Sequence, residues 1–176
     1  MKLRDILFSS LLRQMNTTMI RVGRPSDVPG ALELVKELAE YERAPLEVTN
    51  TVEEMLADGF GEKPIYGLFV AERESVIVGI AIHYVRYSTW KGKIIHLEDL
   101  VVKDKMRGTG LGYALYSEII KQAKLDNVRR IDWHVLDWNT SAIDFYEKSG
   151  AKVLKDWYLT QMDEEGINYF IDNRLK

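Results

Sequence analysis

Two periodicities of apolar residues divide the chain into strands and helices. Apolar residues that run together, or alternate with polar ones, predict strands over 19–22, 66–71, 76–87, 94–102, 130–136, 152–162 and 167–172. Apolar residues three and four positions apart predict helices over 27–39, 51–59, 113–123 and 139–149. Ser26 or Asp27 caps the first helix, and Asn50 or Thr51 caps the second. The resulting order, β-α-α-β-β-β-α-β-α-β-β, predicts an α/β fold in which helices flank a mixed central β-sheet in a single domain.

The composition is that of a soluble globular protein with one ordinary domain. The 176 residues are 46% hydrophobic and 29% charged, with a net charge of −3 and no cysteine. Disulfides and thiolate metal sites are therefore excluded, and the weak negative charge argues against a nucleic-acid partner. No apolar stretch approaches the length of a membrane span. A reducing cytoplasm fits the lack of cysteine, so we expect a cytoplasmic protein.

The first eighteen residues differ from those that follow. Leu3, Ile6 and Leu7 fit one helical face, but Arg4 and Asp5 interrupt the apolar run that a secretory signal needs. A transit peptide, an upstream start codon and a loosely held leader remain as alternatives. We expect residues 1–18 to be a leader or a disordered extension, and the domain to span 19–176.

The segment "MRGTGLG" (106–112) places a glycine-rich turn between a strand and a helix. Such a turn exposes backbone N–H groups at the positive end of the helix dipole, where they favour an anion such as phosphate. Tyr113 follows Gly112, so the segment matches neither a P-loop nor the G-x-G-x-x-G dinucleotide fingerprint. What remains is the pattern R/Q-x-x-G-x-G/A. The alternative is a tight turn whose glycines serve backbone geometry alone.

This pattern after a central strand resembles the pyrophosphate-binding signature of the GNAT acetyltransferases, which use acetyl-coenzyme A. Further segments resemble the diamine N-acetyltransferases, a group that includes the spermidine/spermine and thialysine N-ε-acetyltransferases. They are "KELAEYE" (36–42), "DGFGEKP" (58–64), "YSTWKG" (87–92), "LEDLVV" (97–102), "RGTGLG" (107–112) and "VLDWNTSAIDFYEKSGA" (135–151). The resemblance spans about residues 20–169 and implies the GNAT fold.

The resemblance also implies which residues bind acetyl-CoA. Leu100, Val101 and Val102 are expected to pair their backbone with the pantetheine arm. Asn139 and Ser141, at the start of the helix 139–149, are expected to contact the same molecule. The residues expected around its pyrophosphate are Arg107, Gly108, Thr109, Gly110, Leu111, Gly112 and Tyr113. No metal is expected.

Tyr146 is the expected acid that protonates the leaving thiolate. Asn139 and Tyr146 are seven residues apart, about two helical turns, so they share a face about 10 Å apart along the axis. A tyrosine hydroxyl, with a pKa near 10, can donate a proton to a thiolate when it is held in place. The alternative is a half-buried aromatic residue whose hydroxyl meets water or a carbonyl group.

Glu98 and Asp99 supply carboxylates on the central strand. In a regular strand their side chains point to opposite faces, but GNAT proteins carry a bulge here that re-aims them. By analogy with the family, Glu98 is the general base, directly or through water, and Asp99 binds the amine. The alternative is that either residue pairs with lysines on the sheet.

Three further residues match positions near the family's amine site: Glu42, Glu47 and Trp90. The alternative for each glutamate is a solvated surface charge. The polyamine enzymes have aspartate where this chain has Ser88, whereas the thialysine enzymes share the serine. The loss of one carboxylate favours a shorter, lysine-like amine over a long polyamine.

The histidines His83, His96 and His134 lie on separate expected strands without metal-ligand spacing. His96 either shares a face with Glu98 and bridges a water there, or is a hydrogen-bonded histidine of the sheet.

The resemblance implies direct acetyl transfer from acetyl-CoA to a primary amine of a small lysine-like or diamine substrate. It further implies a homodimer, and neither a nucleic acid nor a membrane is expected as a partner. Two alternatives stay open. One is a protein lysine or N-terminal acetyltransferase, and the other is a non-catalytic CoA-binding sensor.

Overall fold

The computed structural model describes residues 18–175, so the expected leader lies outside the described residues except for Thr18. The chain divides into two compact units, and the boundary along the sequence lies between His134 and Val135. Each unit is described separately. No helix among residues 18–175 has the length and apolar character needed to cross a bilayer.

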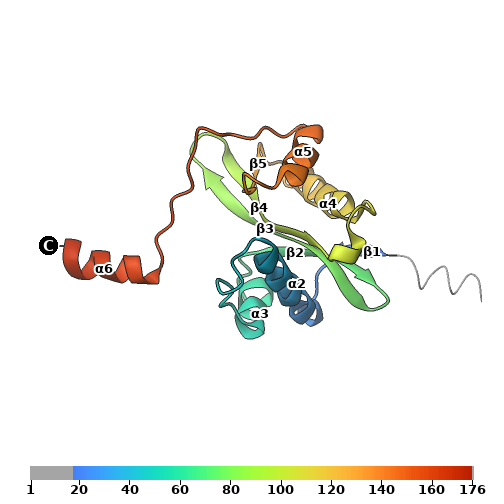
Figure 1. Cartoon of the computed structure of the whole chain (residues 1–176), viewed down its shortest axis with the longest axis horizontal. Coiled ribbons are helices and arrows are strands. Elements are labelled where there is room, and N and C mark those ends of the chain that lie inside the picture. The colour runs from blue at the N-terminus through green and yellow to red at the C-terminus, as the bar shows by residue number, and fades with distance from the viewer. Residues whose placement is uncertain (1–17, 176) are drawn as a thin grey trace, which may run out of the picture. The chain divides into compact units, whose positions relative to one another are not determined.

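The first unit is built on a single five-stranded sheet (Figure 1). Its strands, in spatial and chain order, are β1 (Met19–Val22), β2 (Gly67–Arg73), β3 (Val76–Ser88), β4 (Gly92–Val102) and β5 (Ile131–Asp132). Strands β1 to β4 are antiparallel, and β5 runs parallel to β4. The expected mixed sheet is therefore confirmed.

Helices cover both faces of this sheet (Figure 1). Helices α2 (Val28–Tyr41) and α3 (Val52–Phe60) lie on one face, and α4 (Leu111–Leu125) lies on the other. Short 3-10 helices, η1 (Pro25–Asp27) and η2 (Asp104–Met106), precede α2 and the glycine-rich turn.

The start of α3 shows how the local sequence sets a helix boundary. Thr51 Oγ1 accepts the Glu54 N–H, and the Glu54 carboxylate accepts the Thr51 N–H at 2.9 Å. This reciprocal pair satisfies N–H groups that have no partner inside the helix. Thr51 is thus the cap of the second helix.

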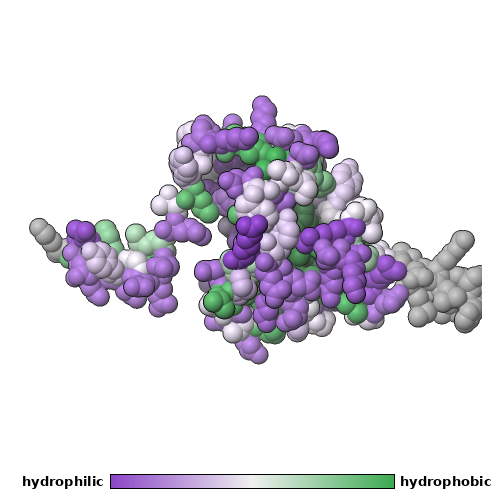
Figure 2. Space-filling view, viewed as in Figure 1, coloured by the Kyte–Doolittle hydropathy of each residue, from purple (hydrophilic) through white to green (hydrophobic). Residues whose placement is uncertain are grey.

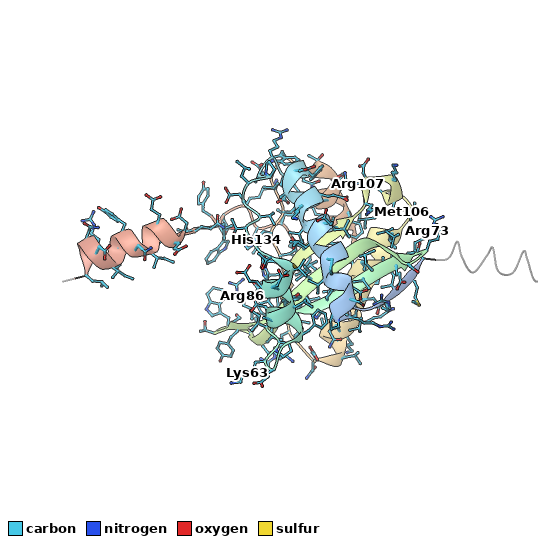
Figure 3. All side chains as sticks on the ribbon, turned by 90° about the horizontal axis from the view of Figure 1, so that it is seen from below. Lys63, Arg73, Arg86, Met106, Arg107 and His134 are labelled. Carbon is cyan, nitrogen blue, oxygen red and sulfur yellow. The ribbon has the colours of Figure 1, made fainter. Side chains whose placement is uncertain are left out.

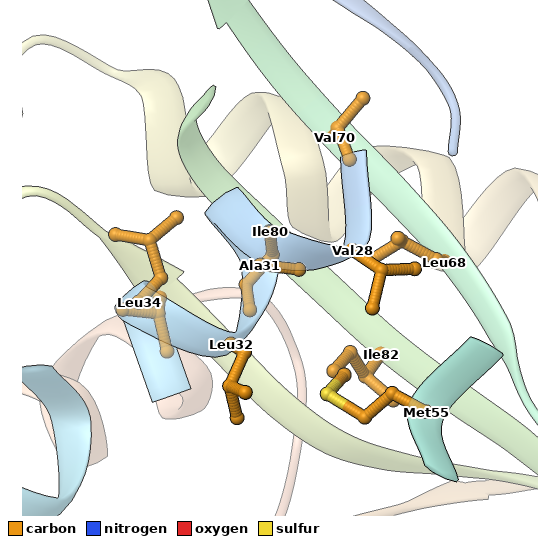
Figure 4. Close-up of a cluster of buried hydrophobic side chains, with 10 residues drawn as sticks. Val28, Ala31, Leu32, Leu34, Met55, Leu68, Val70, Ile80 and Ile82 are labelled. Atoms are coloured by element: carbon orange, nitrogen blue, oxygen red, sulfur yellow. The ribbon is translucent and has the colours of Figure 1, made fainter. Parts of the chain in front are cut away.

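The core lies between α2, α3 and the sheet (Figure 4). Val28, Ala31 and Leu34 of α2 are fully buried and, with Leu32, follow the three-and-four spacing expected of a helix that covers a sheet. They pack with Met55 of α3 and with sheet residues Leu68, Val70, Ile80, Ile82 and Val101. This packing fixes β3 and β4, the strands that carry the candidate site.

The second unit contains α5 (Thr140–Lys148) and α6 (Glu164–Arg174). Helix α5 begins where the sequence predicts, because the Asn139 side chain accepts the Ala142 N–H at 3.3 Å. Helix α6 exposes apolar side chains among polar ones, including Ile167 and Phe170 (Figure 2).

Three predicted strands are wrong or too long. The predicted strand 130–136 is reduced to Ile131–Asp132, because β5 pairs with β4 over only two residues. Residues 152–162 contain no strand, and 167–172 are helical. The segment "DEEG" is a helix start rather than a hairpin turn, because Asp163 Oδ1 accepts the Gly166 N–H at 2.8 Å and two glutamates fill the first turn.

Candidate active site

Strand β4 is paired on both sides in its first half and on one side in its second half. It pairs with β5 at Ile95 and His96, where Ile95 N–H donates to the Arg130 carbonyl at 3.2 Å. Beyond His96, the only strand that pairs with β4 among residues 18–175 is β3. The sheet therefore opens along the second half of β4.

The backbone direction at this opening follows from one hydrogen bond. Lys103, the residue after the end of β4, donates its backbone N–H to the carbonyl of Val78 in β3 at 2.9 Å. Because successive N–H groups of a strand point to opposite edges, those of Leu100 and Val102 point away from β3. A ligand in the opening can thus pair with β4 as an added strand does, which is the role expected of residues 100–102.

A β-bulge lies at the junction of the two halves. Leu97 is opposite His83 and Asp99 is opposite Ile82, so Glu98 is an extra residue without a partner of its own on β3. A bulge interrupts the alternation of side chains and re-aims the extra residue. The expected bulge is therefore present, and it falls on the residue expected to be the base.

The carboxyl groups of Glu98 and Glu42 act on that of Asp99. Burial, followed by the charges of Glu98 and Glu42, raises the pKa of Asp99 to about 6. Partial burial of the Glu42 carboxyl raises its pKa as well. Glu42 follows directly after α2, so the packing of that helix brings it to β4. Closely spaced carboxylates of this kind attract a cation such as an alkylammonium group.

Glu98 also contacts aromatic residues that the sequence analysis did not assign to the site. Burial, the charge of Glu98 and a hydrogen bond with Glu98 raise the pKa of the Tyr84 hydroxyl. His96 Nε2 lies 3.6 Å from Glu98 Oε2, and His96 Nδ1 lies 2.7 Å from Asp132 Oδ1. The expectation that His96 is a hydrogen-bonded histidine of the sheet is confirmed, and its other nitrogen lies near Glu98, where a bridging water stays a prediction.

The glycine-rich turn has the backbone that its sequence predicts. Gly108 and Gly110 have φ angles of +74° and +85°, in the left-handed region that glycine adopts with least strain. A Cβ atom at either position would meet no other atom within 4 Å. Gly110 is the N-cap of α4, whose first N–H groups have no partner within the helix. These features fit a phosphate group, which approaches backbone N–H groups closely.

The side chains around this turn bond within the first unit. Arg107 lies 3.2 Å from Asp104 and stacks over the Tyr41 ring at 4.8 Å, and Thr109 Oγ1 donates to the Met106 carbonyl at 2.7 Å. Arg107, Met106 and Arg73 lie in one region of Figure 3, whereas Arg86 and His134 lie in another.

The remaining predicted site residues lie on exposed loops or in the second unit. Glu47 lies in the loop between α2 and α3, and Trp90 lies in the β3–β4 turn, with 77% of its surface exposed. Asn139, Ser141 and Tyr146 belong to the second unit, where Asn139 and Ser141 begin α5 and Tyr146 lies buried in its last turn. Ser141 Oγ donates to Asn139 Oδ1 at 3.2 Å.

Among residues 18–175, no group of three or more His, Cys, Asp or Glu side chains is arranged to hold a metal ion. The rings of His96 and His134 nevertheless lie 5.2 Å apart. Sequence spacing could not show this contact, because the two residues lie on different segments of the chain.

Comparisons with known proteins place the chain. The model of the acetyltransferase (GNAT) family matches residues 32–151. The thialysine N-epsilon-acetyltransferase of Bos taurus is 37% identical over 164 residues, covering 87% of this chain and 96% of that protein. The Caenorhabditis elegans enzyme of the same name is 32% identical over 151 residues, covering 84% and 93%.

Solved structures agree on the fold. An integron cassette protein from the mobile metagenome of V. cholerae superposes with a TM-score of 0.72 at 19% identity, covering 89% of this chain and 98% of that one. From the match over more than half of its length and from these relatives, we conclude that the chain belongs to the GNAT family of acetyltransferases.

Proposed function

We propose that this enzyme transfers the acetyl group of acetyl-CoA directly to a primary amine of a small, lysine-like substrate. The observation that carries the proposal is the bulge at Glu98, where β4 changes from a paired strand to an open one. The proposed base, Glu98, therefore lies where the edge of β4 begins to lack a strand partner. The relatives named thialysine N-epsilon-acetyltransferase support an amine of this size.

Acetyl-CoA is held by backbone groups in this proposal. Its pantetheine arm pairs with Leu100, Val101 and Val102, and its pyrophosphate meets the N–H groups of residues 108–113. The open space beside Gly108 and Gly110 supports this placement. Arg107 then leaves Asp104 and bonds to the pyrophosphate, while Asn139 and Ser141 contact the same molecule. When bound, acetyl-CoA supplies an activated acetyl thioester.

The carboxylates bind and deprotonate the amine. Glu42, Glu47 and Asp99 attract the ammonium form, and Trp90 borders the site. A primary ammonium group, with a pKa near 10, must lose a proton before it attacks the thioester. Glu98 takes that proton, directly or through one water molecule. Tyr146 donates a proton to the departing thiolate, whose pKa as a thiol is near 8.5.

Ser88 limits the length of the substrate. Its Oγ accepts the Trp90 and Lys91 N–H groups, each at 3.3 Å, and so serves the turn rather than a cation. An aspartate here would add a carboxylate for the far amine of a polyamine. We infer that the enzyme prefers a short amine.

We also infer that the enzyme acts in the cytoplasm as a homodimer and that its domain spans residues 19–176.

CoA release from acetyl-CoA tests the proposal with a panel of amines: thialysine, lysine, ornithine, putrescine, spermidine and a lysine-containing peptide. We expect strong turnover of thialysine or lysine, and its loss in Tyr146→Phe. Phe145→Leu changes the neighbouring aromatic residue and serves as the matched control. Highest turnover of spermidine or of the peptide would overturn the substrate assignment. Acetyl-CoA binding without turnover of any amine would overturn the enzymatic role.

A further inference from the structure

His96 is held between two carboxylates at the point where β5 leaves β4. It is 4% exposed, with Nδ1 2.7 Å from Asp132 Oδ1 and Nε2 3.6 Å from Glu98 Oε2. The Tyr84 and His134 rings lie 5.1 and 5.2 Å from its ring. The imidazole therefore has a fixed orientation, with each nitrogen facing a different carboxylate.

The first of these contacts determines the tautomer. A carboxylate at 2.7 Å accepts a hydrogen bond, so the proton of a neutral ring sits on Nδ1. Nε2 then presents a lone pair toward Glu98. Two acceptors that face each other are compatible only when a proton or a water molecule lies between them. The space between Glu98 Oε2 and His96 Nε2 is therefore a place where a proton or a water molecule can bind.

We propose that His96 receives, at Nε2, the proton that Glu98 removes from the substrate amine, so that Glu98 regains its charge within the catalytic cycle. The inference rests on the proposed role of Glu98 as the base. The ammonium N–H bond breaks and a Glu98 O–H bond forms, directly or through water. That proton then passes to Nε2, and after acetyl transfer it leaves the imidazolium for solvent by way of the exposed Glu98 carboxylate. Charge and protons balance at each step.

Asp132 stabilises the imidazolium in this scheme and is itself paired with two arginines. Arg86 and Arg130 lie 3.5 and 3.4 Å from its carboxylate. The other titratable side chains around the pair are Tyr84 on β3, Asp99 on β4 and His134 after β5. Because His96 acts through Glu98 and not on the substrate, it is a positioning residue.

A second histidine of the sheet, which is partly buried, provides a control. His83, also on the sheet, stacks on the Phe69 ring at 5.4 Å, and its Nδ1 has no hydrogen-bond partner among the described residues. It is opposite Leu97, whereas His96 is opposite Tyr84, so the two rings lie on different faces of the sheet. Replacement of either residue removes an imidazole from the sheet, but only His96 faces Glu98.

The kinetic test compares His96→Gln with His83→Gln using the preferred amine. For His96→Gln we expect kcat/KM for the amine to fall about 100-fold, the lower end of the range for general-base catalysis. The KM for acetyl-CoA should stay unchanged. The acid limb of the pH profile of kcat/KM should differ from that of wild type, because the proton on Glu98 then has no second acceptor. His83→Gln should keep the wild-type limb. Equal profiles for wild type and His96→Gln would overturn the relay.

NMR of the imidazole nitrogens tests the proposal without turnover. The chain has three histidines, so single substitutions assign each ring. For the neutral His96 ring we expect a proton on Nδ1 and none on Nε2. A proton on Nε2 of the neutral ring would overturn the relay. If wild type acetylates no amine, the proposed function fails and the relay fails with it. An active enzyme with the wrong tautomer contradicts the relay alone.

Discussion

The two halves of strand β4 differ in the burial of their side chains and in the number of strands that pair with them. In the first half, Ile94, Ile95 and Leu97 are almost completely buried, and β4 has a strand on each side. In the second half, Glu98 is half-exposed and β4 has lost β5. The first half is buried from Ile94 to Leu97, whereas the second half contributes Val101 to the core and has one backbone edge without a strand partner.

The bulge at Glu98 marks the boundary between the two halves of β4. An unpaired strand edge is a liability in a folded protein because it can pair with another chain. The same edge is useful when it lies next to a carboxylate cluster and a glycine-rich turn. Mutations at Ile95 and at Glu98 should therefore act on different quantities, namely stability at Ile95 and catalysis at Glu98.

Ile95→Ala should give the largest effect, and on stability. Ile95 is 1% exposed, so its truncation should lower the free energy of unfolding by about 3 kcal/mol. Urea unfolding measures this change. Ile120→Ala on α4, where 41% of the residue is exposed, is the control and should cost less than about 1 kcal/mol. An Ile95→Ala protein of wild-type stability would remove the distinction between the halves.

Glu98→Gln should have the opposite effect, lowering activity without lowering stability. Loss of the base should lower kcat/KM for the amine about 100-fold or more, while the KM for acetyl-CoA stays the same. The free energy of unfolding should hardly change, because the Glu98 side chain is 53% exposed. Steady-state kinetics and urea unfolding measure the two quantities. Full activity in this variant would show that the amine loses its proton elsewhere.

Gly110→Ala and Gly92→Ala compare two glycines with similar positive φ angles. Gly110 has φ +85° and Gly92, in the β3–β4 turn, has φ +76°; a Cβ meets no atom within 4 Å at either position. Each substitution should cost about 1 kcal/mol of stability. Only Gly110→Ala should raise the Kd for acetyl-CoA, about tenfold, or ~1.4 kcal/mol, measured by calorimetry. Equal affinities in both variants would argue against pyrophosphate at this turn.

Asp99→Asn should have the smallest effect, which depends on pH. The pKa of Asp99 is raised to about 6, so the folded protein binds this proton more tightly than the unfolded chain does. Wild-type stability from this group is therefore present below about pH 4 and is lost as the pH rises through 6. After solvent screening, Asp99→Asn should gain about 1 kcal/mol at pH 7.5 relative to wild type.

At pH 4 this gain should disappear. Because a carboxylate that attracts the ammonium group is lost, the KM for the amine should also rise about fivefold, or roughly 1 kcal/mol. Urea unfolding at both pH values and amine titration check the two parts. A gain that grows toward low pH would contradict the raised pKa.

The sequence predicts the first unit well because its signals are local. Thr51 and Glu54 cap α3 through side chains three residues apart, and the apolar spacing of α2 matches the face that it buries. The "DEEG" segment shows the limit of such signals. Acidic residues beside a glycine suit both a turn and a helix start, and only the Asp163 hydrogen bond identifies the second.

The candidate site is less predictable because it depends on pairing between distant residues. The position of the bulge follows from the register of β4 against β3, which a single strand does not encode. His96 and Asp132 are 36 residues apart, so their hydrogen bond exists only after β5 joins the sheet. The influence of Glu42 on Asp99 likewise depends on where α2 ends over the sheet.

Residue-level hydrogen exchange along β4, with and without acetyl-CoA, tests the central claim most directly. The Leu100 and Val102 amides point to the open edge, whereas the Val101 amide points to β3. Acetyl-CoA should slow exchange at Leu100 and Val102 and leave Val101 and Ile95 unchanged. If acetyl-CoA binds and the amides of Leu100 and Val102 exchange as before, the open half of β4 is not where the enzyme holds the molecule.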